Sequence, residues 1–317
     1  MSSSVSTPTK LPKNLLHPRY WPSWWAVAGL GLLAFLPWQL RHALGKQLGR
    51  LMYKHNAKRR QIILVNLDFA FPELTTAERE QFVLANLQEY ACALLDYSLL
   101  FFRSRKALYK KIKLSGQEFL EEAIKQNQNI ILLLGHSVWL EFAPVAIGEH
   151  FQAYGSYKPF KNPVFNWLIM QSRLRDVQFV VAREEGMIKL VRSLEPGKLL
   201  FFLPDQDHGA KHSVFAPFFQ AEKSTLTTPA RIAKLGRACA FPIMCFFDSN
   251  TGSYQVKIEA ALEDFGALDA QEDAATMNAS FEKLIRQHPT QYMWLLKLFK
   301  TRPKQDENPY LKLTRHP

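Results

Sequence analysis

The fold is decided by the stretch NIILLLGHSVWLE, residues 129–141. Its run IILLL (130–134) is the short, uninterrupted apolar segment that is typical of a strand buried on both faces. Gly135 and His136 follow at once, and we expect a helix over about residues 138–148. Because a strand that leads directly into a helix is the repeating unit of parallel sheets, the stretch predicts an α/β fold with His136 at the carboxyl end of a strand.

Four more runs of the same kind extend the predicted sheet: QFVVA (178–182), LLFFL (199–203), AFPIMCFF (240–247) and YQVKIEA (254–260). Further helices are expected at about 164–175, 186–194, 225–237 and 276–287. A longer helix over 75–103 begins with the capping-box pair Thr75 and Glu78. The sequence therefore predicts an α/β fold with a largely parallel central sheet flanked by helices.

The formal net charge of +12 lies almost entirely in the first 67 residues, which contain ten of the 40 Lys and Arg residues and no Asp or Glu. The rest of the chain carries 30 basic and 28 acidic residues. A nearly neutral body without a basic, aromatic-interleaved face is not typical of nucleic-acid-binding proteins. We therefore expect no nucleic-acid partner.

The most apolar segment is WWAVAGLGLLAFLPWQL (24–40), which contains no charged residue. Tryptophans at both ends suit the headgroup region, and basic residues cluster from Arg41 onward. This pattern predicts an N-terminal membrane helix with the following domain on the cytoplasmic side. The short length and Pro37 leave two alternatives, a helix lying in the membrane plane and a buried helix of a domain.

Beyond this segment, four apolar side chains recur at helical spacing with basic residues between them: Leu44, Leu48, Leu51 and Met52. A basic amphipathic helix of this kind can lie on an anionic membrane surface. Alternatively, it packs its leucines on the core and exposes its basic residues to solvent.

The chemistry of the predicted sheet edge depends on His136 and Glu141. An imidazole at the carboxyl end of a strand points into the crevice where α/β proteins bind ligands, and it can accept a proton near neutral pH. We predict His136 as a general base and Glu141, in the first turn of the next helix, as the carboxylate that orients its ring. Two alternatives are a helix-capping histidine and a serine nucleophile elbow, in which Ser137 would attack although Trp139 replaces the second glycine of that motif.

A second polar cluster, PDQDHG (204–209), follows LLFFL and should share the sheet edge with His136. We predict that Asp205, Gln206 and Asp207 bind a polar head group, with an Asx-type turn as the alternative. A metal site is a weaker interpretation because no matching ligands follow another strand, and the three cysteines lack metal-ligand spacing. We expect no metal and no cofactor. Basic residues at other crevice positions suit a phosphate or carboxylate on the substrate: Lys158, Arg173, Arg175 and Arg183.

Four passages, taken together and in order, resemble the late acyltransferases of lipid A biosynthesis, which add secondary lauroyl or myristoyl chains to a Kdo-bearing precursor. They are NLDFAFPELTTAERE (66–80), the His136-x4-Glu141 segment, FLPDQDHGAKHSVFAPFF (202–219) and QYMWLLKLFKTRP (291–303). The third and fourth look most like the myristoyl-type branch.

The resemblance implies an acyl carrier protein thioester as donor and a hydroxyl of a hydroxyacyl chain on the lipid A precursor as acceptor. It implies a fold like that of the glycerol-phosphate acyltransferases, and the cytoplasmic side of the inner membrane as location. The chain would then divide into a membrane anchor with a basic amphipathic helix (1–60), an acyltransferase catalytic domain (61–305) and a polar tail (306–317). A glycerol-phosphate or lysophospholipid acyltransferase is the alternative enzyme.

Overall fold

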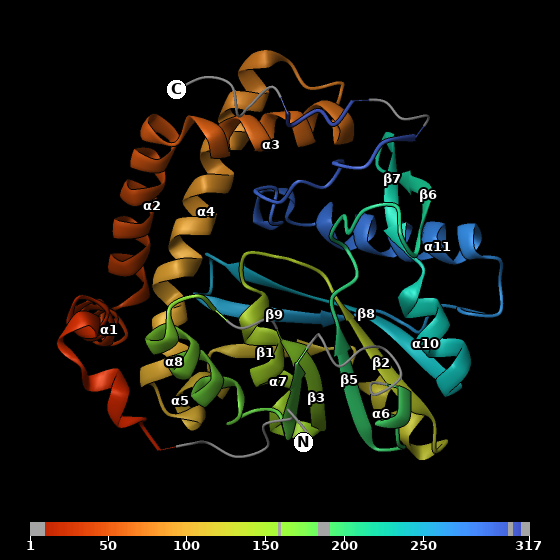
Figure 1. Ribbon diagram of the computed structural model, residues 1–317, viewed down its shortest axis with the longest axis horizontal. Helices are drawn as coiled ribbons and strands as arrows, with labels where there is room; N and C mark the ends of the chain where they lie inside the picture. The colour runs from red at the N-terminus through yellow and green to blue at the C-terminus, as the bar shows by residue number, and fades with distance from the viewer. Residues whose placement is uncertain (1–9, 158–159, 183–190, 304–306, 312–317) are drawn as a thin grey trace.

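The computed structural model describes residues 10–157, 160–182, 191–303 and 307–311. Its centre is a seven-stranded sheet in the order β1-β9-β8-β2-β5-β3-β4 (Figure 1). The strands are β1 (Ile112–Ser115), β2 (Asn129–Leu134), β3 (Gln152–Tyr157), β4 (Phe179–Ala182), β5 (Lys198–Phe202), β8 (Ala238–Asp248) and β9 (Ser253–Ile258). β8 and β9 pair antiparallel, whereas each of the other described pairs in this sheet is parallel. The predicted α/β fold with a largely parallel sheet is confirmed.

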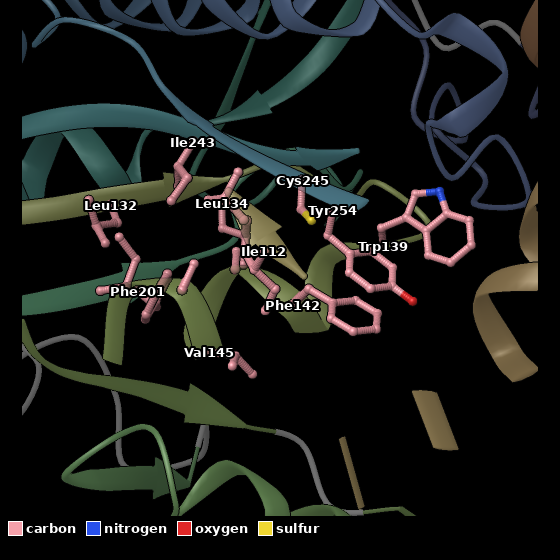
Figure 2. Packing of buried hydrophobic residues seen from close by; sticks show 14 of the residues in the cluster. Ile112, Leu132, Leu134, Trp139, Phe142, Val145, Phe201, Ile243, Cys245 and Tyr254 are labelled. Atoms are coloured by element: carbon pink, nitrogen blue, oxygen red, sulfur yellow. The ribbon is translucent and has the colours of Figure 1, made fainter. Parts of the chain in front are cut away.

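The core lies on both faces of β2. Ile130, Leu132 and Leu134 belong to one buried cluster, and Ile131 and Leu133 belong to a second, because successive side chains of a strand point to opposite faces. Figure 2 shows part of the first cluster, in which β2 side chains pack with those of β5, β8 and β9. The prediction that 130–134 forms a strand buried on both faces is therefore confirmed.

Helices cover both faces of the sheet. They are α1 (Trp21–Leu33), α2 (Trp38–His55), α3 (Ala57–Ala70), α4 (Thr76–Phe102), α5 (Arg105–Tyr109), α6 (Gln117–Lys125), α7 (Ala143–His150), α8 (Pro163–Arg173), α10 (Thr228–Gly236) and α11 (Ala270–Ile285). Side chains of α6 and α7 enter the first cluster, and those of α3, α10 and α11 enter the second. The capping box predicted at Thr75 and Glu78 is present at the start of α4.

Two predicted helices differ from the structure, and a third is only partly described. The one expected over 138–148 begins with a 3₁₀ turn, Leu140–Phe142, and becomes α7 only at Ala143. The segment 225–237 contains the end of β7 (Ala221–Leu226) before α10, and β7 forms a separate antiparallel hairpin with β6 (Ser213–Phe218). Of the helix expected over 186–194, residues 186–190 lie outside the described part of the chain.

The structure does not show the predicted membrane-spanning helix. The apolar segment 24–40 is divided, because α1 ends at Leu33 and α2 begins after Pro37. The 13 residues of α1 extend roughly 20 Å at 1.5 Å per residue, whereas a bilayer core is roughly 30 Å thick. None of the helices in the described part of the chain combines the length and apolar character needed for a membrane crossing.

α2 faces the protein with its small residues and not with its leucines. It runs beside α4 (Figure 1), with Gly45 and Gly49 buried in the contact. A β-carbon at Gly45 would lie 2.8 Å from the Cα of Cys92, and one at Gly49 would lie 2.5 Å from the Cα of Gln88. The leucines predicted as a possible core stripe are exposed instead, so that alternative is wrong.

A buried polar network attaches α2 to the rest of the fold. Asp96 on α4 accepts hydrogen bonds from Arg41 Nε at 2.5 Å, His42 Nε2 at 2.9 Å and Tyr254 Oη at 2.5 Å. The His42 ring also stacks on Trp139, with 5.6 Å between ring centroids. Since Trp139 belongs to the turn after β2, the network links the N-terminal helices to the segment that carries His136.

The polar tail predicted at 306–317 is described only over residues 307–311, and there it is attached to the body. Tyr310 is fully buried. Its hydroxyl donates to Asn66 Oδ1 at 2.5 Å and accepts from the Phe299 N–H at 3.1 Å.

Candidate active site

The site forms where β2 and β5 end side by side. The two strands are parallel, with Leu133 opposite Phe202, and His136 and Asp205 each follow three residues later. The Asp205 carboxylate accepts hydrogen bonds from the ring Nδ1 of His136 and, at 2.7 Å, from the His136 backbone N–H. The prediction that the PDQDHG loop shares a sheet edge with His136 is therefore confirmed.

These contacts orient the ring of His136. Asp205 is 2% exposed. Burial by itself would raise the pKa of the Asp205 carboxyl, but the neighbouring charge of His136 and the hydrogen bonds from its ring and backbone hold that pKa below its ordinary value. An ionised carboxylate only accepts hydrogen bonds, so Nδ1 is the ring atom that donates to Asp205, and in the neutral ring the lone pair then lies on Nε2. That tautomer leaves Nε2 as the atom that can take a proton from a substrate.

Gln206 occupies the position next to that lone pair. Its Nε2 lies 2.8 Å from the Nε2 of His136, so the amide donates to the ring in the tautomer fixed by Asp205. The His136 residue as a whole is 8% exposed. A substrate hydroxyl that replaced the amide donor at this distance would have its proton directed at the imidazole.

The C-terminal segment supports the site from a distant part of the sequence. The Tyr292 hydroxyl donates to Asp205 Oδ2 at 2.9 Å, and the Met293 N–H donates to the His136 carbonyl at 2.8 Å. On the other side of the turn, the Val138 N–H donates to the Gln291 carbonyl at 2.8 Å. Sequence reasoning assigned no role to Tyr292, because no local pattern reveals a contact across 87 positions.

Glu141 does not orient the His136 ring in this structure, and this part of the prediction needs correction. Both ring nitrogens are taken by Asp205 and Gln206, while the Glu141 carboxylate forms an ion pair with Arg173, whose Nε donates to Oε2 at 3.1 Å. The cause is local: Glu141 belongs to the 3₁₀ turn and not to the first turn of an α-helix. Arg173 is the last residue of α8, and so the pair joins the turn to α8.

The other candidates fall into separate groups. Asp207 accepts hydrogen bonds from the Thr301 N–H at 2.5 Å, from the Thr301 hydroxyl at 2.9 Å and from the Gly209 N–H at 2.9 Å, which anchors the loop to the C-terminal segment. Lys158 and Arg183 lie outside the described residues. Arg175 donates to the Arg103 carbonyl at 3.2 Å. Within the described ranges, no group of three or more His, Cys, Asp and Glu side chains gathers in a metal-binding arrangement.

Ser137 lacks the geometry of a nucleophile elbow. It is fully buried, and its hydroxyl has no hydrogen-bond partner in the described structure. A catalytic serine needs a base within hydrogen-bond reach, yet the ring nitrogens of His136 bond to Asp205 and Gln206. The arrangement thus supports His136 as a base that acts directly on a substrate hydroxyl.

Known proteins similar to this chain give the site its context. A lipid A biosynthesis lauroyltransferase of Escherichia coli K12 is 32% identical over 302 residues, which cover 93% of this chain and 98% of that protein. A lipid A biosynthesis myristoyltransferase of the same organism is 30% identical and covers 96% of this chain and 95% of that protein. These identities do not separate a lauroyl-type from a myristoyl-type branch.

A more distant match is the crystal structure of a 1-acyl-sn-glycerophosphate acyltransferase from Thermotoga maritima. It is 12% identical, covers 79% of this chain and 95% of that chain, and has a TM-score of 0.35. The score is too low to carry a conclusion about the fold. The family model of the bacterial lipid A biosynthesis acyltransferases, by contrast, matches residues 9–301. With relatives at this identity over nearly the whole chain and a polar site at the carboxyl edge of its sheet, the chain belongs to the bacterial lipid A biosynthesis acyltransferase family.

Proposed function

We propose that this acyltransferase moves a lauroyl- or myristoyl-type chain from acyl carrier protein to a hydroxyl of a hydroxyacyl chain on a Kdo-bearing lipid A precursor. The observation that carries the proposal is the His136 ring, which Asp205 holds with Nε2 as the acceptor at a sheet edge. The relatives support the choice of substrates, because they are a lauroyltransferase and a myristoyltransferase of lipid A biosynthesis.

The reaction needs one base and no external energy source, since a thioester is already activated. The acceptor hydroxyl gives its proton to Nε2 of His136 while its oxygen attacks the thioester carbonyl. The tetrahedral intermediate then collapses, the carbon–sulfur bond breaks, and the departing thiolate takes the proton back from the imidazolium. Asp205 stabilises that imidazolium and keeps the ring in place, as a carboxylate does in serine-type triads.

Glu141 and Arg173 remain part of the proposed site, but Glu141 contacts Arg173 and not His136. The carboxylate orients the guanidinium by two contacts, and an oriented guanidinium suits a phosphate or carboxylate on the acceptor. Glu141 would then act by positioning Arg173, whereas Gln206 and Asp207 shape the loop beside His136. Lys158 and Arg183 remain proposed contacts for the acceptor.

The experiment is an acyl-transfer assay with the purified full chain and two competing acceptors. Lauroyl- and myristoyl-acyl carrier protein would serve as donors, with a Kdo-bearing lipid A precursor in one reaction and glycerol 3-phosphate or a lysophospholipid in the other. Mass spectrometry should detect one added acyl chain on the lipid A precursor. Transfer only to glycerol phosphate or a lysophospholipid would refute the proposal in favour of the alternative enzyme.

Two variants separate the base from the rejected serine mechanism in the same assay. His136→Ala should lower transfer by about two orders of magnitude or more. Ser137→Ala should retain transfer within a few-fold, because its hydroxyl has no partner in the described site. Loss of activity in Ser137→Ala, with the fold intact, would support Ser137 as a nucleophile instead.

The proposed place of action is the cytoplasmic side of the inner membrane. Its support is an exposed apolar surface on α1, α2 and the turn between them, called here the N-terminal apolar face. It consists of Trp25, Leu32, Phe35, Leu40, Leu44, Leu48 and Leu51, each exposed. Exposed basic residues adjoin it at Lys46, Arg50 and Lys54, which suits an anionic lipid surface. The three cysteines are free, as is usual in a reducing compartment.

A further inference from the structure

The segment that supports the active site has little regular structure of its own. A 3₁₀ turn ends at Gln291, and Tyr292 forms an isolated β-bridge, after which the chain continues in turns. Even so, the Gln291 carbonyl and the Met293 N–H bond to the turn 136–138, and the Tyr292 hydroxyl bonds to Asp205. Backbone without a hydrogen-bonded ladder must find other partners for its polar groups. The placement of these three contacts therefore depends on side chains that bind the segment from other elements.

Asn86, on α4, binds the segment at the residues that contact the site. It is fully buried, and its Nδ2 donates to the Thr290 carbonyl at 2.7 Å and to the Tyr292 carbonyl at 2.8 Å. An amide nitrogen carries two hydrogens, and both are used here. The two carbonyls lie on either side of Gln291. Asn86 thus fixes the backbone from which the Tyr292 ring projects.

A continuous series of contacts leads from Asn86 to the base. The backbone of Tyr292 is held by Asn86, and its hydroxyl donates to Asp205 Oδ2 at 2.9 Å. Burial and the nearby Asp205 carboxylate raise the pKa of the Tyr292 hydroxyl well above its usual value, so it keeps its proton and stays a donor. Asp205 in turn accepts from the ring Nδ1 and the backbone N–H of His136. A shift of the Tyr292 backbone would therefore displace a donor that holds the carboxylate against the ring.

A second buried asparagine provides an internal comparison. Asn66, on α3, is also fully buried, and its Nδ2 donates to the Trp294 carbonyl at 2.6 Å and to the Leu296 carbonyl at 2.7 Å. The chemistry is the same, but among the described contacts neither of these two residues hydrogen-bonds to His136 or Asp205. Asn66 therefore holds the segment at positions beyond those that contact the site.

We propose that Asn86 is a positioning residue for acyl transfer, which places Tyr292 and thereby holds the Asp205 carboxylate against His136. The inference rests on the proposed role of His136 as the base. Asn86→Ala removes both donors to the segment, so Tyr292 loses the anchor of its backbone. A misplacement of about 1 Å far from the chemistry can cost about 10²-fold in rate. Because Asn86 is buried away from any substrate, the loss should appear in kcat with KM unchanged.

The test is a pair of double-mutant cycles on kcat, with saturating donor and acceptor. One cycle combines Asn86→Ala with Tyr292→Phe, and the other combines Asn66→Ala with Tyr292→Phe. Asn86→Ala alone should lower kcat roughly ten-fold, because the bonds between Asp205 and His136 remain. Its double variant with Tyr292→Phe should lose little more than the larger single loss, since both changes act on the same contact.

Asn66→Ala is the matched control, because it removes the same two amide donors from the same segment. It should lower the free energy of unfolding about as much as Asn86→Ala in urea denaturation, yet keep kcat within about three-fold. Its effect on kcat should multiply with that of Tyr292→Phe, as expected for independent sites. If Asn86→Ala does not fold, Asn86→Ser takes its place in the first cycle, since serine keeps one hydroxyl donor.

The outcomes separate this inference from the proposed function. Losses of kcat that multiply in the cycle of Asn86 with Tyr292 would overturn the inference, and so would equal losses of kcat in the two asparagine variants. All variants are assayed with whichever acceptor the wild type acylates, so an unexpected acceptor refutes the proposed function and leaves the cycles decisive. An active His136→Ala would refute the proposed base and this inference together. Uncoupled losses in an enzyme that needs His136 would refute only the role of Asn86.

Discussion

At the scale of single residues, the most direct prediction concerns the carboxylate that holds the base. Asp205→Asn keeps the shape of the side chain but presents an amide where the ring needs an acceptor, so the wrong tautomer of His136 is favoured. By analogy with the aspartate of serine proteases, transfer should fall by about 10²-fold or more. The measurement is kcat with the acyl carrier donor and the lipid A precursor, with circular dichroism as the check on folding.

Tyr292→Phe is the matched comparison for Asp205→Asn. It removes one donor to Asp205 Oδ2 and leaves both bonds between Asp205 and His136. The expected loss is no more than about ten-fold, the order of one hydrogen bond. If Asp205→Asn kept near wild-type activity while Glu141→Gln lost it, the carboxylate that matters for His136 would be Glu141, as the sequence first indicated.

Some residues of the site were predictable from the sequence, and others were not. His136 and the PDQDHG loop were predictable because each directly follows a buried apolar run, and parallel strands bring their carboxyl ends to one edge. The partner of the ring was not predictable, since it depends on whether the chain after His136 turns as an α-helix or as a 3₁₀ turn. Tyr292 reaches the site from a distant part of the sequence, and only the packed fold brings it near Asp205.

At the scale of elements, the packing of α2 on α4 depends on glycine. Gly49→Ala places a methyl group 2.5 Å from the Cα of Gln88, so the helices must separate. The free energy of unfolding should decrease by about 1–3 kcal/mol, the usual cost of overpacking. Gly29→Ala is the control, because nothing lies within 4 Å of the added β-carbon on α1. It should be neutral or stabilise by up to about 1 kcal/mol through helix propensity. Urea denaturation measures the free energy of unfolding of both variants. Equal changes would show that the close contact between α2 and α4 does not cause the loss of stability.

The buried network around Asp96 makes the stability of the same pair of helices depend on pH. Burial would raise the pKa of Asp96, but the hydrogen bond and charge of His42 and the charge of Arg41 hold it below its ordinary value. The unfolded chain therefore takes up a proton at Asp96 before the folded chain does as the pH falls. The stability contributed by this carboxylate is complete above about pH 4 and is lost as the pH falls through the folded value.

Asp96→Asn should therefore lower the free energy of unfolding at pH 7 by about 3–5 kcal/mol, because it leaves Arg41 buried without its counter-charge. The difference in the free energy of unfolding between Asp96→Asn and wild type should become smaller when the same urea titration is repeated at pH 3. A constant difference at both pH values would mean that packing, and not charge, accounts for the loss.

Elements marked by local signals were predicted well, and those without them were missed. α4 has a complete capping box, whereas the β6–β7 hairpin turns at Phe219 and Gln220, with Phe219 at a φ of 54°. A left-handed residue in a two-residue hairpin turn is usually Gly, Asn or Asp, so residues 219 and 220 did not predict a turn. α2 was predicted as a helix, but its buried face follows Gly45 and Gly49 because only glycine allows the close approach to α4.

At the scale of the whole molecule, the N-terminal apolar face is the proposed site of membrane contact. Trp25 is 77% exposed and Leu32 is 76% exposed, and Leu40, Leu44, Leu48 and Leu51 follow one side of α2. Each such side chain gains roughly 1.5–3 kcal/mol when it leaves water completely. The adjoining basic residues add attraction to anionic lipids. Both effects support the proposal that the protein lies on a membrane surface through α1 and α2.

The corresponding prediction is that the full chain binds vesicles containing phosphatidylglycerol more tightly than vesicles of phosphatidylcholine alone, and that added salt weakens the binding. Replacing Leu44 and Leu48 together by Glu should lower binding at least ten-fold, because it removes apolar area and adds charge that anionic lipid repels. Leu235→Glu is the control, since Leu235 is 64% exposed on α10, outside the N-terminal apolar face. Co-sedimentation measures all three proteins. If the double variant bound as well as wild type while Leu235→Glu did not, another surface would carry the membrane contact. A double variant that still transfers acyl chains to detergent-dispersed acceptor, but not to acceptor in vesicles, would show that the face delivers the site to the bilayer and takes no part in the chemistry at His136.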